Sequence, residues 1–204
     1  MPRVELDLRR LEPGETPRDT TLAPAEDADA LVVRGPVHAL SAVLARLLKT
    51  GRTAQVPVAW EPGSDRDSVG LARDLDIGTG APRDLTLVRD DHGGVLLHHG
   101  RLEAAGDARR ALSRRLGLQA HHDDIKVADG EITRIDVRTE WRAVDTIAVT
   151  VMTLPLRPTR QTTGRALQVA CDPARIVRDG VPYPRPVTKW TWYADDRVRW
   201  RLQP

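Results

Sequence analysis

The sequence predicts an α/β plus all-β fold, in which a reduced α/β half precedes an antiparallel β-sandwich half. Residues 30–33 form an apolar run, and the apolar positions of residues 37–49 recur at helical spacing. A second apolar run, followed by a short helical pattern, occupies residues 56–77. Later in the chain apolar residues alternate with a period of two, which is typical of antiparallel strands. We therefore expect an α/β domain over residues 1–80 and a mainly β domain with one helix over residues 81–204.

The composition excludes several classes of protein. The 31 basic and 29 acidic side chains are interspersed, so no basic block marks a nucleic-acid partner. Cys171 is the only cysteine, which excludes an internal disulfide framework and a multi-cysteine zinc site. No apolar run reaches the roughly 18 residues of a membrane span, and the N-terminus lacks the pattern of a signal peptide. We therefore expect a cytoplasmic protein without a transmembrane segment.

In the first half, each predicted element follows from a local pattern. Residues 4–8 alternate between apolar and polar, as an edge strand does. Residues 11–27 contain prolines and no helical period, so we expect a connector. Pro36 suits the first position of the helix at residues 37–49, and a shorter helix is expected at residues 68–75.

In the second half, the pattern changes to short strands. Residues 84–89 and 94–99 have the pattern of a hairpin, and residues 101–118 carry apolar positions at helical spacing, so we expect the last helix there. Asp129-Gly130 is a strong signal for a two-residue turn. The remaining strands are expected at residues 125–128, 132–137, 146–154, 166–170, 175–177, 187–193 and 198–202.

Two loops that follow strands are candidates for a ligand site. Gly35 lies at the first strand-to-helix turn, where backbone N–H groups favour phosphate, but Pro36 removes one donor, so a structural turn is the favoured interpretation. Residues 63–68 combine a glycine, hydroxyls and carboxylates ahead of a helix. There Asp67 or Ser68 is first a helix cap, and a ligand loop is the alternative.

Two polar groups in the second half have a structural interpretation first. Residues 121–124, His-His-Asp-Asp, have suitable atoms for a metal, but adjacent side chains diverge along an extended chain, so we predict a solvated turn and no metal site. Asp179 precedes Gly180 and is first a turn residue; only its neighbours in the fold could make it a general base. Trp190 and Trp192 share one strand face, where we expect core packing.

The order of elements and three local motifs resemble the catalytic family of diacylglycerol kinases, bacterial lipid kinases related in fold to NAD kinases. In that family an apolar strand leads into Gly-Gly-Asp-Gly-Thr. Here residues 31–33 lead into residues 34–38, where Gly35 is retained and Pro36 replaces the acidic residue. The resemblance implies that the first half is a reduced nucleotide-binding half.

The second and third motifs extend the resemblance along the chain. The family pattern Pro-x-Gly-Thr-Gly-Asn-Asp is similar to residues 62–68, with Gly63 retained, Ser64 in place of threonine and Asp67 in place of asparagine. The following Ala-Arg-x-Leu-x-Ile at residues 72–77 is the best-kept piece. The family's Asp-Gly-Glu corresponds to Asp179-Gly180-Val181, with valine in place of glutamate, and the chain is shorter than a full member.

The resemblance implies two alternatives for the function. In an active lipid kinase, ATP with Mg²⁺ lies against the two turns, and Asp179 deprotonates a lipid hydroxyl that attacks the γ-phosphate. In an inactive relative, the fold serves as a binding, regulatory or protein-interaction module, with the tryptophan-rich C-terminal sheet as a contact surface. The implied partners are a nucleotide, a lipid at a membrane surface, or another protein. The residues implied for nucleotide binding are Arg34, Gly35, His38, Gly63, Ser64 and Asp67.

Overall fold

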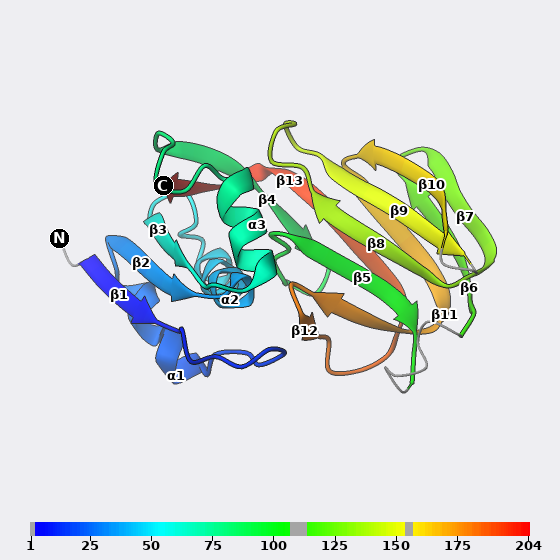
Figure 1. Cartoon of the computed structure of the whole chain (residues 1–204), viewed down its shortest axis with the longest axis horizontal. Helices are drawn as coiled ribbons and strands as arrows, with labels where there is room; N and C mark the ends of the chain where they lie inside the picture. The colour runs from blue at the N-terminus through cyan, green and yellow to red at the C-terminus, as the bar shows by residue number, and fades with distance from the viewer. Residues whose placement is uncertain (1–2, 107–113, 154–156) are drawn as a thin grey trace.

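The computed structural model describes residues 3–106, 114–153 and 157–204, and its strands form one continuous hydrogen-bonded system. The main path of strand neighbours is β1-β2-β3-β13-β11-β5-β8-β9-β10. Figure 1 shows an α/β part at the N-terminal end of the molecule and a part made only of strands at the other end. The predicted fold class is confirmed.

The α/β part begins with three parallel strands. β1 (Arg3–Asp7) pairs with β2 (Ala30–Gly35), which pairs with β3 (Pro57–Pro62). The helix α2 (Val37–Lys49) follows β2, and α3 (Arg66–Asp74) follows β3. The edge strand and both helices were predicted from their periodicity, and each lies within two residues of its predicted start or end.

The connector between β1 and β2 contains helical turns that the sequence did not reveal. Residues 19–22 form α1 (Asp19–Leu22), and the 3₁₀ helix η1 (Ala23–Glu26) continues from it. Leu22 and Ala25 are buried in the core of the α/β part. Four-residue helices are too short to show a helical period, which is why the prediction of an irregular connector was wrong here.

The strands of the second part form two layers that share β11. β11 pairs with β13 and β6 through residues 166–171, and with β5 through residues 174–178, so it passes from one layer to the other. The strands are β4 (Arg83–Asp90), β5 (His99–Ala104), β6 (Leu116–His122), β7 (Ile125–Ile132), β8 (Arg134–Thr139), β9 (Ile147–Thr153), β10 (Arg157–Gly164), β11 (Ala166–Arg178), β12 (Val181–Pro182) and β13 (Val187–Gln203).

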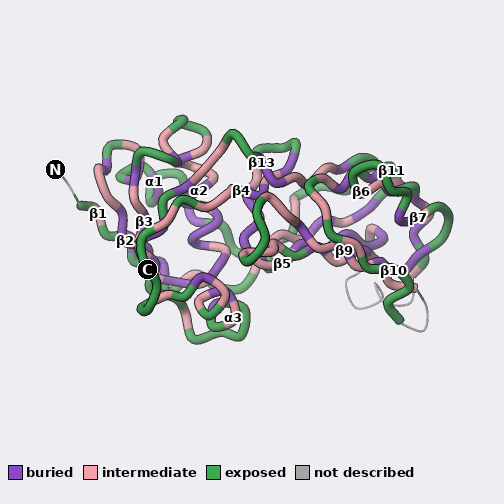
Figure 2. The backbone as a smooth tube through the Cα atoms, turned by 90° about the horizontal axis from the view of Figure 1, so that it is seen from above, coloured by how far each residue is buried: buried purple, intermediate pink, exposed green. Residues whose placement is uncertain are grey.

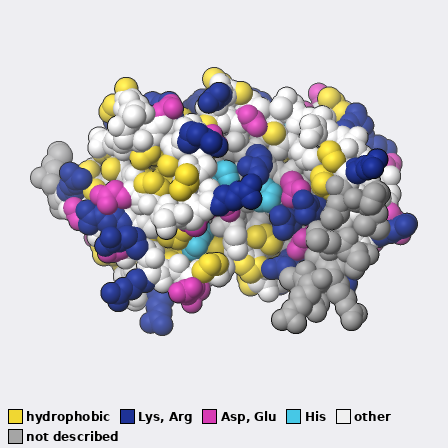
Figure 3. Space-filling model, in the orientation of Figure 1, with side chains coloured by type: hydrophobic (Ala, Val, Ile, Leu, Met, Phe, Trp, Pro, Cys, Tyr) yellow, Lys and Arg dark blue, Asp and Glu magenta, His cyan; other side chains and the backbone are white. Residues whose placement is uncertain are grey.

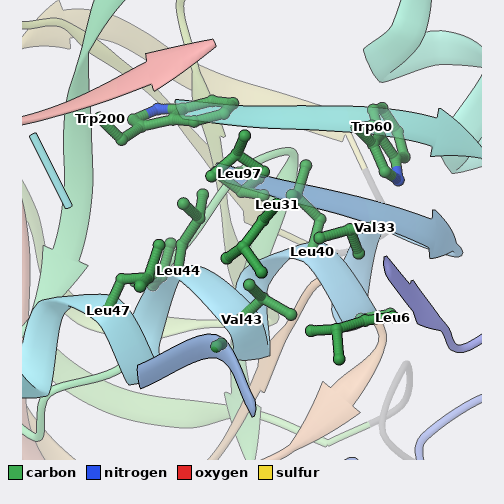
Figure 4. Close-up of a cluster of buried hydrophobic side chains, with 14 of the residues drawn as sticks. Leu6, Leu31, Val33, Leu40, Val43, Leu44, Leu47, Trp60, Leu97 and Trp200 are labelled. Carbon is green, nitrogen blue, oxygen red and sulfur yellow. The ribbon is translucent and has the colours of Figure 1, made fainter. Parts of the chain in front are cut away.

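Two hydrophobic cores lie within these layers, and Figure 2 shows the buried backbone running through both parts of the molecule. The second core fills the sandwich and includes Trp190 and Trp192, so their predicted role in core packing is confirmed. In the first core, the apolar face of α2 packs on β2. Figure 4 shows Leu40, Val43, Leu44 and Leu47 of the helix with Leu6, Leu31, Val33, Trp60, Leu97 and Trp200.

The last strand belongs to both parts. β13 pairs with β11 through residues 187–193 and ends with residues 201–203 parallel to β3. Trp200 and Leu202 are accordingly fully buried in the first core. The domain boundary at residue 80 stays a prediction. The first core also contains side chains that follow residue 80 in the sequence, such as Leu97 and Trp200.

The predicted helix at residues 101–118 is wrong at both of its described ends. Residues 99–104 are β5 and residues 116–122 are β6, while residues 107–113 lie outside the described chain. Leu102 lies opposite Ile135 of β8 and Ile176 of β11. Pairing on both edges of β5 satisfies its backbone and buries its alternate side chains, which outweighs the helical spacing.

One predicted turn and the strand pairing of one predicted hairpin also differ from the structure. Asp129 and Gly130 continue β7 and lie opposite β6, so the turn prediction was wrong. The chain turns instead at Asp123, whose φ of 51° is left-handed and whose carboxylate accepts backbone N–H bonds from residues 165 and 166. The predicted hairpin of residues 84–99 is reduced to one bridge between Arg89 and Val95, because β4 pairs with β13.

Candidate functional site

A cavity of about 580 Å³ opens at the carboxyl ends of the parallel strands β1, β2 and β3. In open α/β sheets, loops at this end of the strands form the usual ligand site. Residues after β2 and β3 meet the β11–β12 turn here, although that turn lies more than 100 positions later in the chain. The lining residues are Arg9, Leu11, Pro13, Gly14, Gly35, Pro36, Val37, His38, Pro62, Gly63, Ser64, Asp65, Arg66, Asp67, Asp179 and Gly180.

The structure brings most of the predicted site residues to this cavity. Six of them line it: Gly35, His38, Gly63, Ser64, Asp67 and Asp179. Arg34 is not part of the lining. Its guanidinium bonds Glu5 through a terminal nitrogen at 2.9 Å and Glu61 through Nε at 2.7 Å. These two carboxylates neutralise the positive charge of Arg34, which the sequence had suggested as a phosphate ligand.

Neighbouring protein atoms account for one of the two predicted glycines. Gly35 has a φ of 148°, and a Cβ there would lie 2.9 Å from the backbone carbonyl atoms of Leu8. Backbone atoms cannot give way easily, so the close approach of Leu8 requires glycine at position 35. A Cβ on Gly63 would lie 2.9 Å from Asp65 Oδ2, which is the end of a side chain and can shift.

The first turn of α3 is capped by an acidic side chain. Asp65 Oδ1 accepts a hydrogen bond from the backbone N–H of Ser68 at 2.9 Å, and Oδ2 accepts one from Ser68 Oγ at 2.5 Å. The cap is therefore Asp65, and the prediction of Asp67 or Ser68 was wrong. Burial opposes ionisation, but the hydrogen bonds from Ser68 hold the pKa of Asp65 below its ordinary value. An ionised carboxylate thus occupies the place where a helix N-terminus would hold a phosphate.

Ser68 also connects the two helices at the cavity. Its Oγ accepts a hydrogen bond from the backbone N–H of Val37, in the first turn of α2, at 3.2 Å. Ser68 is fully buried, and its hydroxyl in turn donates a hydrogen bond to Asp65 Oδ2. Both helix N-termini are therefore satisfied, at these donors, by side chains of the protein itself.

Asp179 is buried in a nest of donors. It lies in the turn between β11 and β12 with a φ of 46°, and its side chain is only 6% exposed. Its own N–H bonds the carbonyl oxygen of His99 at 2.8 Å. Four donors reach its carboxylate: Ser41 Oγ at 2.5 Å and Leu97 N at 2.9 Å to Oδ2, and His98 N at 2.8 Å and His99 N at 2.9 Å to Oδ1.

This arrangement decides what Asp179 can do chemically. A carboxylate offers about four lone-pair positions, and all four are used here. A general base needs a free lone pair directed at the proton it removes. Asp179 instead connects α2, through Ser41, with the residues that lead into β5.

Burial favours the neutral form of two histidines near the cavity. Burial lowers the pKa of His38 although Asp65 and Asp179 oppose the shift. Burial and Arg138 lower the pKa of His98. Among the described residues, His38 Nε2 is buried without a hydrogen-bond partner. It therefore offers an unused polar atom at the α2 end of the cavity.

The charged groups at the cavity wall are unfavourable for a triphosphate. Arg9 is engaged by Asp7 through two hydrogen bonds of 2.9 and 2.6 Å, which leaves Arg66 as the other arginine of the lining. Asp65 and Asp67 add negative charge to the same wall. Within residues 3–106, 114–153 and 157–204, no group of three His, Cys, Asp or Glu side chains could hold a metal ion.

Sequence reasoning missed two residues that shape this site. Asp65 stands three residues before Ser68, and this spacing is itself a capping signal. Ser41 is a polar residue among the buried positions of α2, which marks a hydroxyl with a buried partner.

Among the described helices, none is long and apolar enough to cross a membrane.

Comparisons with known proteins identify the fold. No family model and no curated protein matches the sequence. A diacylglycerol kinase structure from Bacillus anthracis str. Sterne superposes with a TM-score of 0.64 at 11% identity, covering 92% of this chain and 83% of that one. An NAD kinase from Archaeoglobus fulgidus, solved in complex with ATP, gives a TM-score of 0.53 at 12% identity and covers 87% and 78% of the two chains.

Proposed function

We propose that this chain, which has the fold shared by the diacylglycerol kinase and NAD kinase structures, is a non-catalytic binding protein of that fold. The observation that carries the proposal is the state of Asp179, the residue expected to act as general base. Its carboxylate is buried and accepts four hydrogen bonds from the protein. Removing a proton from a substrate would require breaking at least one of them.

The charge of the cavity indicates the kind of ligand. Asp65 places a negative charge at the α3 N-terminus, and Asp67 lies exposed beside it. A phosphate at this point would meet like charges instead of free N–H groups. A cavity of about 580 Å³ is within the usual size for a small organic ligand. We therefore expect an uncharged ligand, with a nucleoside as the class that the fold suggests.

The second candidate is the active enzyme, an ATP-dependent kinase acting on a lipid hydroxyl. The observation that favours it is the convergence of Gly35, Gly63 and Asp179 on one cavity. The backbone contact that explains Gly35 without a ligand counts against it. Phosphoryl transfer depends on charge-neutralised phosphates and a positioned base, and this cavity supplies neither in a free form.

Removing the charge of Asp65 separates the two candidates. Asparagine caps a helix about as well as aspartate, so Asp65→Asn removes the charge and keeps α3 capped. We expect calorimetry to show adenosine binding more tightly than ATP with Mg²⁺ to the unchanged protein. Asp65→Asn should raise the affinity for ATP about tenfold and leave that for adenosine unchanged, because only the triphosphate meets the carboxylate.

The matched control is Asp67→Asn, which removes an exposed carboxylate that caps nothing. It should change ATP affinity less than Asp65→Asn does. Transfer of phosphate from ATP to diacylglycerol by the unchanged protein, lost in a folded Asp179→Asn variant, would overturn the proposal in favour of the kinase. If neither adenosine nor ATP binds, the nucleoside proposal fails, and the ligand would be sought among proteins and lipids.

A further inference from the structure

The polar outer face of the strands β5 and β8 carries a cluster of cations around one carboxylate. It begins at His99, whose backbone N–H bonds Asp179 of the cavity lining at 2.9 Å. The five residues His99, Arg101, Arg134, Asp136 and Arg138, here called the arginine cluster, lie on two paired strands. Figure 3 shows Lys, Arg and His side chains gathered near the centre of this face, over β5 and β8.

One aspartate organises the cluster. Asp136 accepts hydrogen bonds from Arg134 Nε at 2.8 Å and from Arg101 Nε at 3.3 Å, and His99 Nε2 lies 3.1 Å away. Burial of Asp136 raises its pKa, but His99, Arg134 and Arg101 outweigh that effect and lower it. The carboxylate is therefore ionised and holds two guanidinium planes in fixed orientations.

The arginines are not saturated by this contact. Among the described residues, Arg101 and Arg134 form hydrogen bonds only through Nε, so their terminal nitrogens remain available. Arg138 lies opposite His99, is exposed, and has no salt bridge to any described residue. Three arginines thus face one aspartate, an excess of two positive charges.

The neighbouring strands do not supply the missing negative charge. The residues of β9 opposite Arg138, Asp136 and Arg134 are Ala148, Thr150 and Met152. On the β11 side, the residue opposite Arg101 is Val177. The nearby Glu103 is already bonded to Arg175 at 3.3 Å. Asp74 and Glu140 line a pocket together with Arg138, but neither forms a salt bridge with it. An excess of positive charge on a rigid sheet face favours binding of an anion.

We propose that the arginine cluster binds a phosphate group. Two forked guanidinium groups from adjacent strands offer donors in different directions, which suits a tetrahedral anion with several oxygens. The site is separate from the cavity, since neither Arg101, Arg134 nor Asp136 lines it. The phosphate is carried either by a small molecule in solution or by a lipid headgroup.

Calorimetry of the full chain with inorganic phosphate at low ionic strength tests the proposal. We expect millimolar or tighter binding, weakened about tenfold by Arg134→Gln, because two charge-assisted hydrogen bonds are lost. Arg115→Gln is the matched control, since Arg115 pairs with Glu131 on the surface of the same part of the molecule. It should leave the affinity unchanged.

A second variant and a second probe make the test independent of folding and of the phosphate source. Arg138→Gln removes an exposed charge that has no hydrogen bond to a described residue, so it should weaken binding without lowering the Tm. Vesicles of phosphatidylcholine with and without phosphatidic acid form a parallel arm, and the arm in which Arg134→Gln loses binding identifies the source. No binding in either arm, or equal loss in Arg115→Gln, would overturn the proposal. Asp65→Asn should not change this binding, which separates it from the cavity.

Discussion

The cavity at the strand ends and the arginine cluster on the sheet face differ in how far their polar and charged groups are paired within the protein. In the cavity, the caps at the helix N-termini and the carboxylate of Asp179 are satisfied by the protein's own groups. On the sheet face, Arg101 and Arg134 share Asp136, and Arg138 has no salt bridge to any described residue. At the N-terminus of α3, where the fold would favour an anion, the carboxylate of Asp65 already accepts the backbone hydrogen bond. The excess of positive charge lies on β5 and β8 instead. Position in a fold and capacity to bind are therefore separate properties.

The largest effect should come from Asp179, where a stabilising role and a catalytic role predict different results. Asp179→Ala leaves the backbone N–H groups of residues 97–99 without their acceptor, while the Ser41 hydroxyl can still donate to the carbonyl oxygen of Val37 at 3.2 Å. We expect the free energy of unfolding in urea to fall by about 3–6 kcal/mol, because each unsatisfied buried donor costs about 1–3 kcal/mol. A variant of unchanged stability would contradict the interpretation of Asp179 as a buried connector.

Trp200 tests whether the two parts of the molecule unfold together. It comes from β13, is fully buried in the first core, and meets Trp141 edge to face with 6.4 Å between ring centroids. Trp200→Ala should lower the free energy of unfolding by about 3–5 kcal/mol and keep a single transition. Val144→Ala is the control, since Val144 is 78% exposed and should change stability little. Two separate transitions would show that the parts are independent.

The smallest expected effect is a loss of stability in mild acid that both parts share. Burial lowers the pKa of His38 and His98 at the α/β part and of His122 in the sandwich. A histidine with a lowered folded-state pKa stabilises the protein fully above its unfolded value of about 6.5, and this contribution is lost as the pH falls below that value. We expect the Tm to decrease from pH 7.5 to about pH 5.

His122→Gln shows how much of this acid sensitivity belongs to the sandwich. His122 is 2% exposed, and its Nδ1 lies 2.6 Å from Thr162 Oγ1 of β10. The variant should flatten the dependence of Tm on pH, because glutamine does not titrate. An unchanged slope would assign the effect to His38 and His98 alone.

What the sequence predicted well depends on local pattern. The strand at residues 30–35 and the helix after it repeat their apolar positions with a clear period, so their type and order were predictable. The convergence of Gly35, Gly63 and Asp179 followed from the order of elements in the resembling family. These are properties that a short window of sequence, or a short motif, contains.

What the sequence did not predict depends on distant partners. Residues 101–104 were included in the helix predicted for residues 101–118, but they form a strand because β8 and β11 pair on both sides. The four donors to Asp179 come from residue 41 and residues 97–99, so no local pattern indicates that its carboxylate is saturated. The arginine cluster similarly forms only when β5 and β8 are placed side by side. Side-chain satisfaction is a property of the assembled sheet.

The path of β13 sets an order on how the molecule forms during synthesis. Its seventeen residues begin beside β11 and end beside β3. The residues of β3 that it pairs with come more than 140 positions earlier in the sequence. The N-terminal sheet therefore leaves the ribosome with one edge of β3 unpaired and with a gap where Trp200 belongs. Until β13 emerges, that edge and gap are exposed to other chains and to chaperones. A strand from late in this sequence therefore completes the core that β1, β2 and β3 begin.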